Sequence, residues 1–228
     1  MEGFININKP SGITSYDVIR FIKKTFHPKE KIGHTGTLDP LASGVLVICI
    51  GRATKRAHLF LGMEKEYITT MELGKSTDTD DIDGNVIRTG PVDKITTEDV
   101  QKAILGFKGD IEQVPPVVSA LKLKGEKLYN LYRKGNPVIL EARKINIKEI
   151  EILNIEIPYV TIRVICGRGT YMRALCRDIG EKLGCGATQS KLLRTRVGNF
   201  KVEDGIPLEE LKKRSLESCL LHENFGQK

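Results

Sequence analysis

Asp39 is the residue of this chain whose surroundings best suit chemistry. It lies in the stretch Gly33 to Gly44, where three glycines allow unusual backbone angles and Pro40 restricts the residue before it. The apolar run from Gly44 to Ile50 follows and is typical of a buried strand. A carboxylate on a stiff loop that enters the core suits covalent or acid–base chemistry. A lone Asp-Pro pair more often only initiates a turn, so the rest of the chain has to decide.

Apolar periodicity predicts the elements that position this loop. A strand is predicted at residues 3–7, followed by a helix that Thr14 or Ser15 caps and that ends near Phe26. The later predictions are a basic helix at 52–62, a strand at 64–74, a turn at 77–84, a helix at 96–107, strands at 144–155 and 159–166, a helix at 170–179, a strand or turn at 191–197 and a short helix at 208–213. Because strands outnumber helices without regular β-α-β alternation, we predict a mixed α/β (α+β) protein with a large, mostly antiparallel sheet.

The composition is typical of a soluble globular protein. Of 228 residues, 40% are hydrophobic and 29% are charged. No apolar run approaches the ~18 residues of a membrane span, and the N-terminus lacks a signal-peptide pattern. The five cysteines are scattered and never spaced as CxxC, which predicts reduced, buried thiols in a cytoplasmic protein. The four histidines show no metal-ligand spacing, so we expect no metal.

The net charge of +7 is unevenly distributed along the chain. Residues 1–60 carry nine Lys/Arg and four Asp/Glu, a net charge of +5, and residues 157–228 carry thirteen and eight, also +5. Residues 61–118 carry six and twelve, a net charge of −6. A basic chain with one acidic block indicates a face that binds RNA or DNA and a separate solvated face.

Two other motif interpretations fail on spacing. Counted from Asp78, the acidic stretch Thr77 to Gly84 places apolar Ile82 at the fifth position of a calcium loop, and Thr89 rather than Glu at the twelfth. We therefore predict a turn between two strands. The glycines around Asp39 lack the GxxxxGK[ST] spacing of a phosphate loop and precede a strand rather than a helix.

Residues 122–134 combine basic side chains with Tyr129 and Tyr132. That combination suits contact with an RNA backbone together with stacking on bases. An amphipathic helix with inward-facing tyrosines explains the pattern equally well, so both interpretations stay open.

Gly-His-Thr-Gly-Thr-Leu-Asp-Pro-Leu-Ala-Ser-Gly, at residues 33–44, closely resembles the signature of the TruB family of tRNA pseudouridine synthases. Further stretches resemble family motifs in the expected order: Asn8–Gly12, Lys65–Tyr67, Thr77–Gly84, Gly109–Gln113, Ser119–Lys122, Gly169–Arg173 and Leu192–Arg194. The resemblance runs from about residue 3 to about residue 213. Guide-RNA-dependent relatives share the catalytic motif but are usually longer.

The resemblance implies a pseudouridine-synthase fold with helices and loops flanking the sheet and a central active-site cleft. It also implies that Asp39 is the nucleophile, that Arg173 pairs with its carboxylate, that Tyr67 stacks on the target base and that Tyr171 accepts the proton from C5. No metal or cofactor is implied.

Weaker matches concern substrate binding. His34 resembles the histidine that wedges into RNA to hold a flipped uridine out of its stack, and Leu193 resembles an apolar residue that closes the base pocket. Asp81 matches an aspartate that acts electrostatically on the active-site arginine. Lys9, in the N-terminal motif, is grouped with these substrate-binding residues.

We therefore expect a monomeric, cytoplasmic enzyme that isomerises the T-arm uridine of tRNA, U55 in standard tRNA numbering. Residues 1–228 would form a single catalytic domain with an RNA-gripping insertion at about 109–137. A C-terminal module of the PUA type, common in the family, would be absent or truncated. The alternatives are a non-catalytic tRNA-binding or tRNA-folding protein, or a synthase that acts on another RNA.

Overall fold

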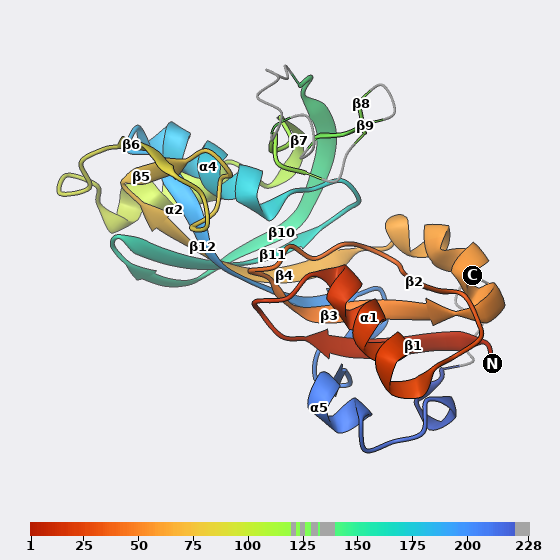
Figure 1. The fold of residues 1–228 in the computed structure, drawn as a ribbon. Coiled ribbons are helices and arrows are strands. Elements are labelled where there is room, and N and C mark those ends of the chain that lie inside the picture. Colours follow the sequence, from red (N-terminus) through yellow and green to blue (C-terminus); the bar gives the residue numbers. More distant parts are fainter. Residues whose placement is uncertain (120–121, 124–125, 129–131, 133–139, 222–228) are drawn as a thin grey trace. The chain divides into compact units, whose positions relative to one another are not determined.

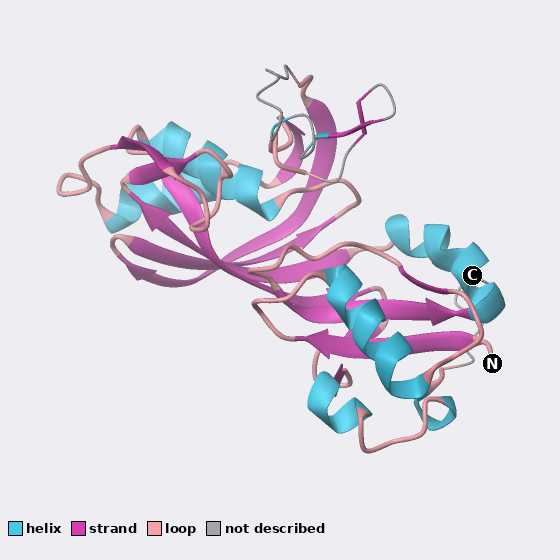
Figure 2. Ribbon diagram, viewed as in Figure 1, coloured by secondary structure: helices cyan, strands magenta, loops and turns pink. Residues whose placement is uncertain are grey.

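Strand pairing dominates the structure and confirms the predicted mixed α+β class. In the part of the chain that the structure describes, ten strands form one mostly antiparallel sheet. Its main path runs β14-β1-β3-β12-β4-β11-β10-β7, with β2 beside β3 and β13 beside β12. Helices flank the strands, as Figure 2 shows in cyan and magenta. Parallel pairing occurs between β1 and β14 and between β3 and β12.

A computed structural model describes residues 1–119, 122–123, 126–128, 132 and 140–221 (Figure 1). The chain divides into a first unit, residues 1–67 and 193–228, and a second unit, residues 68–192. Strand β4 (Lys65–Leu73) and strand β12 (Ala187–Val197) each contribute residues to both units.

The first unit contains the N-terminal elements and those that follow β12. They are β1 (Gly3–Lys9), α1 (Ser15–Phe26), β2 (Ile32–His34), β3 (Ser43–Ile50), the 3₁₀ helix η1 (Gly51–Leu61), β13 (Phe200–Lys201), β14 (Ile206–Pro207), α5 (Leu208–Leu211) and the 3₁₀ helix η2 (Glu217–Cys219). Helix η1 contacts β1, β2 and β3, and α5 contacts β1 and β14.

One part of the core of the first unit lies on one face of β1 and β3. The ring of Phe60, from η1, lies 5.0 Å from the ring of Phe4 and 5.6 Å from that of Phe200, measured between centroids. The buried cluster comprises Phe4, Val45, Val47, Cys49, Ala53, Phe60, Val197 and Phe200. Alternate residues of β3 thus pack on η1, which gives the Asp39 loop a fixed base.

Helix α1 begins and ends as predicted. Thr14 caps it in a reciprocal capping box with Asp17, and the helix ends at Phe26 before His27, whose φ is 48°. The basic helix predicted at 52–62 is confirmed and is the 3₁₀ helix η1 (Gly51–Leu61). The Thr54 hydroxyl bonds the Gly51 carbonyl at 2.8 Å, and such a side-chain bond competes with regular α-helical bonding.

The second unit contains the remaining elements. They are β5 (Lys75–Thr77), β6 (Val86–Thr89), α2 (Thr97–Leu105), β7 (Gly109–Gln113), β8 (Lys122–Leu123), β9 (Glu126–Lys127), β10 (Arg143–Glu156), β11 (Tyr159–Cys166) and α4 (Met172–Leu183). Helix α2 contacts both α4 and β10. Strand β10 pairs with β7 and β11.

The structure tests three further predictions. The acidic stretch at 77–84 is the turn between β5 and β6, as predicted. The predicted strand or turn at 191–197 is the second half of the longer strand β12. All five cysteines are buried and free, in agreement with the thiol prediction. Most of the basic, tyrosine-containing stretch at 122–134 lies outside the described residues.

Candidate active site

The loop that carries Asp39 joins β2 to β3 in the first unit. These strands pair antiparallel, with His34 opposite Ile48, so residues 35–42 form the connection. Within it the amide of Ala42 donates to the carbonyl of Asp39 at 3.1 Å, and the Asp39 side chain is half-buried. The carboxylate therefore stands on a hydrogen-bonded turn.

Two serines near the start of α1 brace this loop. The buried Ser15 hydroxyl accepts from the Leu38 amide at 2.8 Å and lies 3.0 Å from the Leu38 carbonyl, to which it donates. The Ser11 hydroxyl donates to the carbonyl of Leu41 at 2.7 Å. Residues on both sides of Asp39 are thus held by side chains from one preceding segment, which limits the backbone motion of the nucleophile candidate.

Lys9 lies inside this brace and is fully buried. Its ammonium donates to the carbonyls of Pro10 at 2.9 Å, Ile13 at 2.7 Å and Pro40 at 3.4 Å. Burial lowers the pKa of Lys9 from its ordinary value of 10.5 to about 8, although the charge of Asp39 opposes that shift. These contacts give Lys9 a supporting role for the Asp39 loop, and its assignment to substrate binding stays a prediction.

The lowered pKa of Lys9 predicts how stability changes with pH. Between pH 8 and pH 10 the unfolded chain binds the Lys9 proton while the folded chain has lost it, so this residue's contribution to the free energy of unfolding rises with pH. Shifts of this size predict a gain of about 2 kcal/mol over that window. Urea unfolding of the wild type and of Lys9→Met at pH 8 and pH 10 measures this gain, because all other groups titrate alike in the two proteins. An equal pH slope in the two proteins would contradict the shift.

Arg194 is a second buried cation at this loop, with 3% of its surface exposed. Its guanidinium donates to the carbonyls of Val45 at 2.8 Å, Gly36 at 3.1 Å and Thr37 at 3.5 Å. It thus bonds both arms of the loop that carries Asp39. The sequence interpretation gave Arg194 no role, and its only signal was its place in a basic, apolar stretch that resembles a family motif.

The close approach of β3 and β12 depends on Gly44, which is paired with Arg194 in the strand register. The φ of Gly44 is +102°, and a Cβ atom there would lie 2.2 Å from the Arg194 carbonyl oxygen. Only glycine meets both conditions. One of the three glycines noted in the sequence is therefore required at the point where the arginine reaches the loop.

The other first-unit candidates lie on the neighbouring strands. His34, at the end of β2, and Leu193, paired with Ser43, are both half-buried, whereas Tyr67 of β4 is 8% exposed. Leu192 is buried and precedes Leu193 on the same strand. Because neighbouring residues of a strand face opposite sides, only one of these leucines lies on any given face of β12.

Arg173 is held within the second unit by two carbonyls and a carboxylate. Its guanidinium donates to the carbonyls of Thr79 and Val118, each at 2.9 Å. One nitrogen also lies 3.5 Å from a carboxylate oxygen of Asp81. Both side chains of this ion pair are at least nine-tenths buried, so the attraction between them is weakly screened.

Hydrogen bonds also hold Asp81 and Tyr171, which lie close to Arg173 in space or in sequence. The Asp81 carboxylate accepts from the Thr79 hydroxyl at 2.7 Å and from the Asp83 amide at 3.2 Å. Tyr171, the residue before α4, is clasped through its backbone by Gln113. The Gln113 amide accepts from the Tyr171 amide at 2.9 Å and donates to its carbonyl at 3.2 Å.

The eight candidates of the sequence therefore fall into two groups. Lys9, His34, Asp39, Tyr67 and Leu193 belong to the first unit, and Asp81, Tyr171 and Arg173 belong to the second. The first group offers a braced carboxylate beside buried cations, which suits nucleophilic attack. The predicted pairing of Asp39 with Arg173, and the predicted central cleft, stay predictions.

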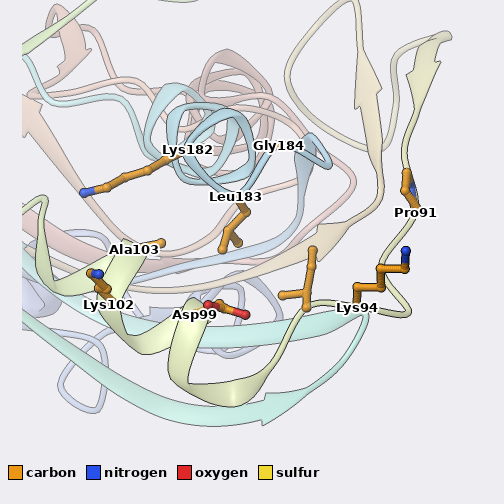
Figure 3. Close-up of a pocket in the computed structure, with 9 residues that line it drawn as sticks. Pro91, Lys94, Asp99, Lys102, Ala103, Lys182, Leu183 and Gly184 are labelled. Carbon is orange, nitrogen blue, oxygen red and sulfur yellow. The ribbon is translucent and has the colours of Figure 1, made fainter.

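A cavity of about 530 Å³ lies elsewhere in the second unit, beside α2 and α4 (Figure 3). None of the eight candidates lines it. Figure 3 shows Lys182 extending away from the side on which Pro91 and Lys94 lie, so the lysines that line the cavity do not converge on one point. The lining residues are Pro91, Lys94, Ile95, Asp99, Lys102, Ala103, Lys182, Leu183 and Gly184.

The described residues contain neither a cluster of metal-ligating side chains nor a helix of membrane-spanning length. No group of three or more His, Cys, Asp or Glu side chains in that part of the chain could hold a metal ion. Among the same residues, no helix has the length and apolar character needed to cross a membrane.

Two family models match the chain in succession. Residues 23–172 match the N-terminal domain of the TruB family of pseudouridylate synthases, and residues 173–223 match the C-terminal domain of tRNA pseudouridylate synthase B. Among curated proteins, tRNA pseudouridine synthase B of Clostridium tetani is 50% identical over 97% of this chain and 76% of its own length. The protein of the same name from Clostridium kluyveri is 49% identical over 95% of this chain and 74% of its own length.

Solved structures give the same match at lower identity. A chain in an H/ACA RNP bound to a substrate RNA containing 2′-deoxyuridine is 32% identical, with a TM-score of 0.69 over 92% of this chain. A chain in a Cbf5-Nop10-Gar1 complex is 35% identical, with a TM-score of 0.71 over 92% of this chain. This chain spans 52% and 54% of those two chains, about half of their length.

Proposed function

The chain belongs to the TruB family of pseudouridylate synthases, and from this membership we propose that it converts U55 in the T-arm of tRNA to pseudouridine. The observation that carries the proposal is the braced Asp39 loop, because the reaction needs one nucleophile held in a fixed position. Residues 1–228 act as one catalytic domain, since β4 and β12 run through both units.

The reaction is an isomerisation in which atoms and electrons balance. The bond between N1 of uracil and C1′ of ribose breaks, and a bond between C5 and C1′ forms. One proton leaves C5 and one is gained at N1, so no oxidant, reductant or energy donor is consumed. The proposal accordingly includes no cofactor and no metal.

The four catalytic candidates each have a role in this reaction. Asp39 is the nucleophile that allows uracil to detach, and Arg173 orients its carboxylate. Tyr67 stacks on the flipped base, a contact worth about 1–3 kcal/mol per base. Tyr171 receives the proton from C5, directly or through a relay.

Base flipping falls to the substrate-binding candidates. Flipping costs a few kcal/mol, which the insertion of His34 and the closure of Leu193 over the base help to offset. Asp81 acts through its ion pair with Arg173. The protein acts as a monomer in the cytoplasm on its tRNA substrate, and the insertion at about 109–137 grips the RNA.

Release of tritium from tRNA labelled at C5 of uridine tests the proposal. C5 loses its hydrogen only if uracil is rejoined through C5, so the wild type is expected to release one tritium per tRNA. A transcript in which U55 is replaced by cytidine is the control and is expected to release none.

Other results would favour the alternatives. Salt-sensitive binding of tRNA without any release would favour a non-catalytic tRNA-binding or tRNA-folding protein. Release from a different RNA but not from tRNA would favour a synthase with another substrate, and solved relatives that act within H/ACA RNPs give that alternative a structural basis.

A further inference from the structure

Arg177 lies on α4 one helical turn after Arg173 and has three hydrogen-bond partners. Its guanidinium donates to the Asp80 carboxylate at 2.8 Å, to the Val114 carbonyl at 2.8 Å and to the Asp178 carboxylate at 3.0 Å. About a quarter of the Arg177 side chain is exposed, and Asp80 is 14% exposed. The pair is thus largely shielded from water, where charged hydrogen bonds are strong.

Arg173 and Arg177 bridge the same two segments. Each reaches the turn of residues 77–84 on one side and the segment of residues 114–118 on the other. Residues four apart on a helix lie on one face, so the two guanidinium groups form a ladder between these segments. Arg177 bonds Asp80, which is next to Thr79, and Val114, which is four positions before Val118. It therefore fixes the segments that carry the two carbonyl partners of Arg173.

Asp80 has a backbone conformation that suits this task. Its φ is +63°, which non-glycine residues rarely adopt although Asp tolerates it better than most. The Asp80 carbonyl accepts from the Gln189 amide, and the Ile82 amide donates to the Gln189 carbonyl, each at 3.0 Å. Burial raises the pKa of Asp80, and the charge of Arg177 opposes the shift. The left-handed turn therefore joins the 77–84 turn to β12 and aims the Asp80 carboxylate at α4.

We propose that Arg177 and Asp80 are a positioning pair for Arg173. They hold the 77–84 turn and the 114–118 segment against α4, so that the carbonyls of Thr79 and Val118 converge on the Arg173 guanidinium. The inference rests on the proposed function, because it assigns the pair an effect on the isomerisation. Neither residue touches the substrate in this assignment.

An ordinary surface ion pair on the same helix provides a matched comparison. Arg88 of β6 donates to Glu181 of α4 at 2.9 Å, and both side chains are about half exposed. That pair also joins the β5–β6 hairpin to α4, but it bonds neither the 77–84 turn nor the 114–118 segment. Arg88→Met therefore removes the same charge without touching the partners of Arg173.

The first test compares the kinetics of Arg177→Met, Asp80→Asn and Arg88→Met on C5-labelled tRNA. Misplacement of Arg173 in the first two is expected to lower kcat by about tenfold or more, with KM for tRNA changed by less than about twofold. Arg177→Lys keeps the charge without the fork that reaches two partners, so it is expected to restore only part of kcat. Arg88→Met is expected to match the wild type.

A double-mutant cycle separates positioning from loss of stability. If Arg177 acts through Arg173, then Arg177→Met is expected to lower kcat far less in an Arg173→Lys background than in the wild type. Equal factors in the two backgrounds, or a rise in KM with unchanged kcat, would overturn the proposal.

Hydrogen exchange keeps this test separate from the proposed function. Loss of the charged hydrogen bonds in Arg177→Met is expected to make the amides of residues 77–84 and of Val114, Val117 and Val118 exchange about tenfold faster, while Arg88→Met leaves them unchanged. Unchanged exchange in Arg177→Met would show that Arg177 and Asp80 do not hold the two segments, and it would overturn the positioning pair even if the wild type is active. A wild type without turnover would refute the proposed function and, with it, the effect of the pair on the isomerisation. The exchange result would still decide whether Arg177 and Asp80 hold the two segments against α4.

Discussion

Asp39→Asn is expected to abolish tritium release while the affinity for tRNA stays near that of the wild type. An amide has the shape of the carboxylate but is a far weaker nucleophile, so the chemical step should fail in an intact loop. Binding should persist because the substitution removes a negative charge, and phosphate contacts dominate affinity for nucleic acids. Single-turnover tritium release and filter binding at fixed salt measure the two quantities separately.

Two further variants make this result specific. Asp39→Glu keeps the charge but moves it along a longer side chain, and a misplacement of about 1 Å is expected to cost about 100-fold in rate. Asp204→Asn changes an exposed aspartate of the same unit and is expected to have wild-type turnover. Near-wild-type turnover by Asp39→Asn would remove Asp39 from the role of nucleophile.

Arg194→Lys is expected to give the second-largest loss of activity in a protein that still folds. The arginine fork bonds three carbonyls on both arms of the Asp39 loop, and a lysine ammonium cannot reproduce that planar geometry. The loop should then hold Asp39 less firmly, with a fall in kcat of about 100-fold. Arg194→Met, which leaves the carbonyls without their donor, is expected to lower the free energy of unfolding by about 3 kcal/mol.

Arg196→Lys is the matched control for this prediction. Arg196 lies on the same strand, two residues along, and bonds Glu64 at 2.7 Å rather than the Asp39 loop. Its replacement is expected to leave kcat within about twofold of the wild type, as for other partly exposed ion pairs. If both lysine variants lost activity equally, the effect would belong to the loss of an arginine fork anywhere on β12 and not to the bracing of Asp39.

Local patterns in the sequence predicted much of the secondary structure. The alternation of Tyr67, Thr69, Met71 and Leu73 predicted one buried face of β4, and all four side chains are buried. The capping candidates Thr14 and Ser15 predicted the start of α1, and Thr14 is the residue that caps it. The basic helix predicted at 52–62 is also present, as the 3₁₀ helix η1, in which a threonine hydroxyl bonds a backbone carbonyl.

Contacts between distant parts of the chain were beyond such patterns. In the sequence Arg194 is one of several basic residues, and no residue near it in the chain indicates which groups its guanidinium binds. Its role follows from the parallel pairing of β3 with β12, which places Arg194 opposite Gly44, 150 positions away. Arg177 likewise has no special local pattern, and its partners Asp80 and Val114 come from two separate segments.

The sequence by itself determined which groups are present and which local elements they form. Apolar residues that recur every two or about 3.6 positions, capping residues and glycine positions depend only on neighbours in the chain. They can therefore be recognised before the fold is known. The family motifs also made Asp39 the candidate nucleophile. Only the tertiary structure decided that Lys9 and Arg194 are buried beside the Asp39 loop and that Arg173 and Arg177 bridge two segments. A buried cation needs several acceptors that converge on it, and here distant segments supply them.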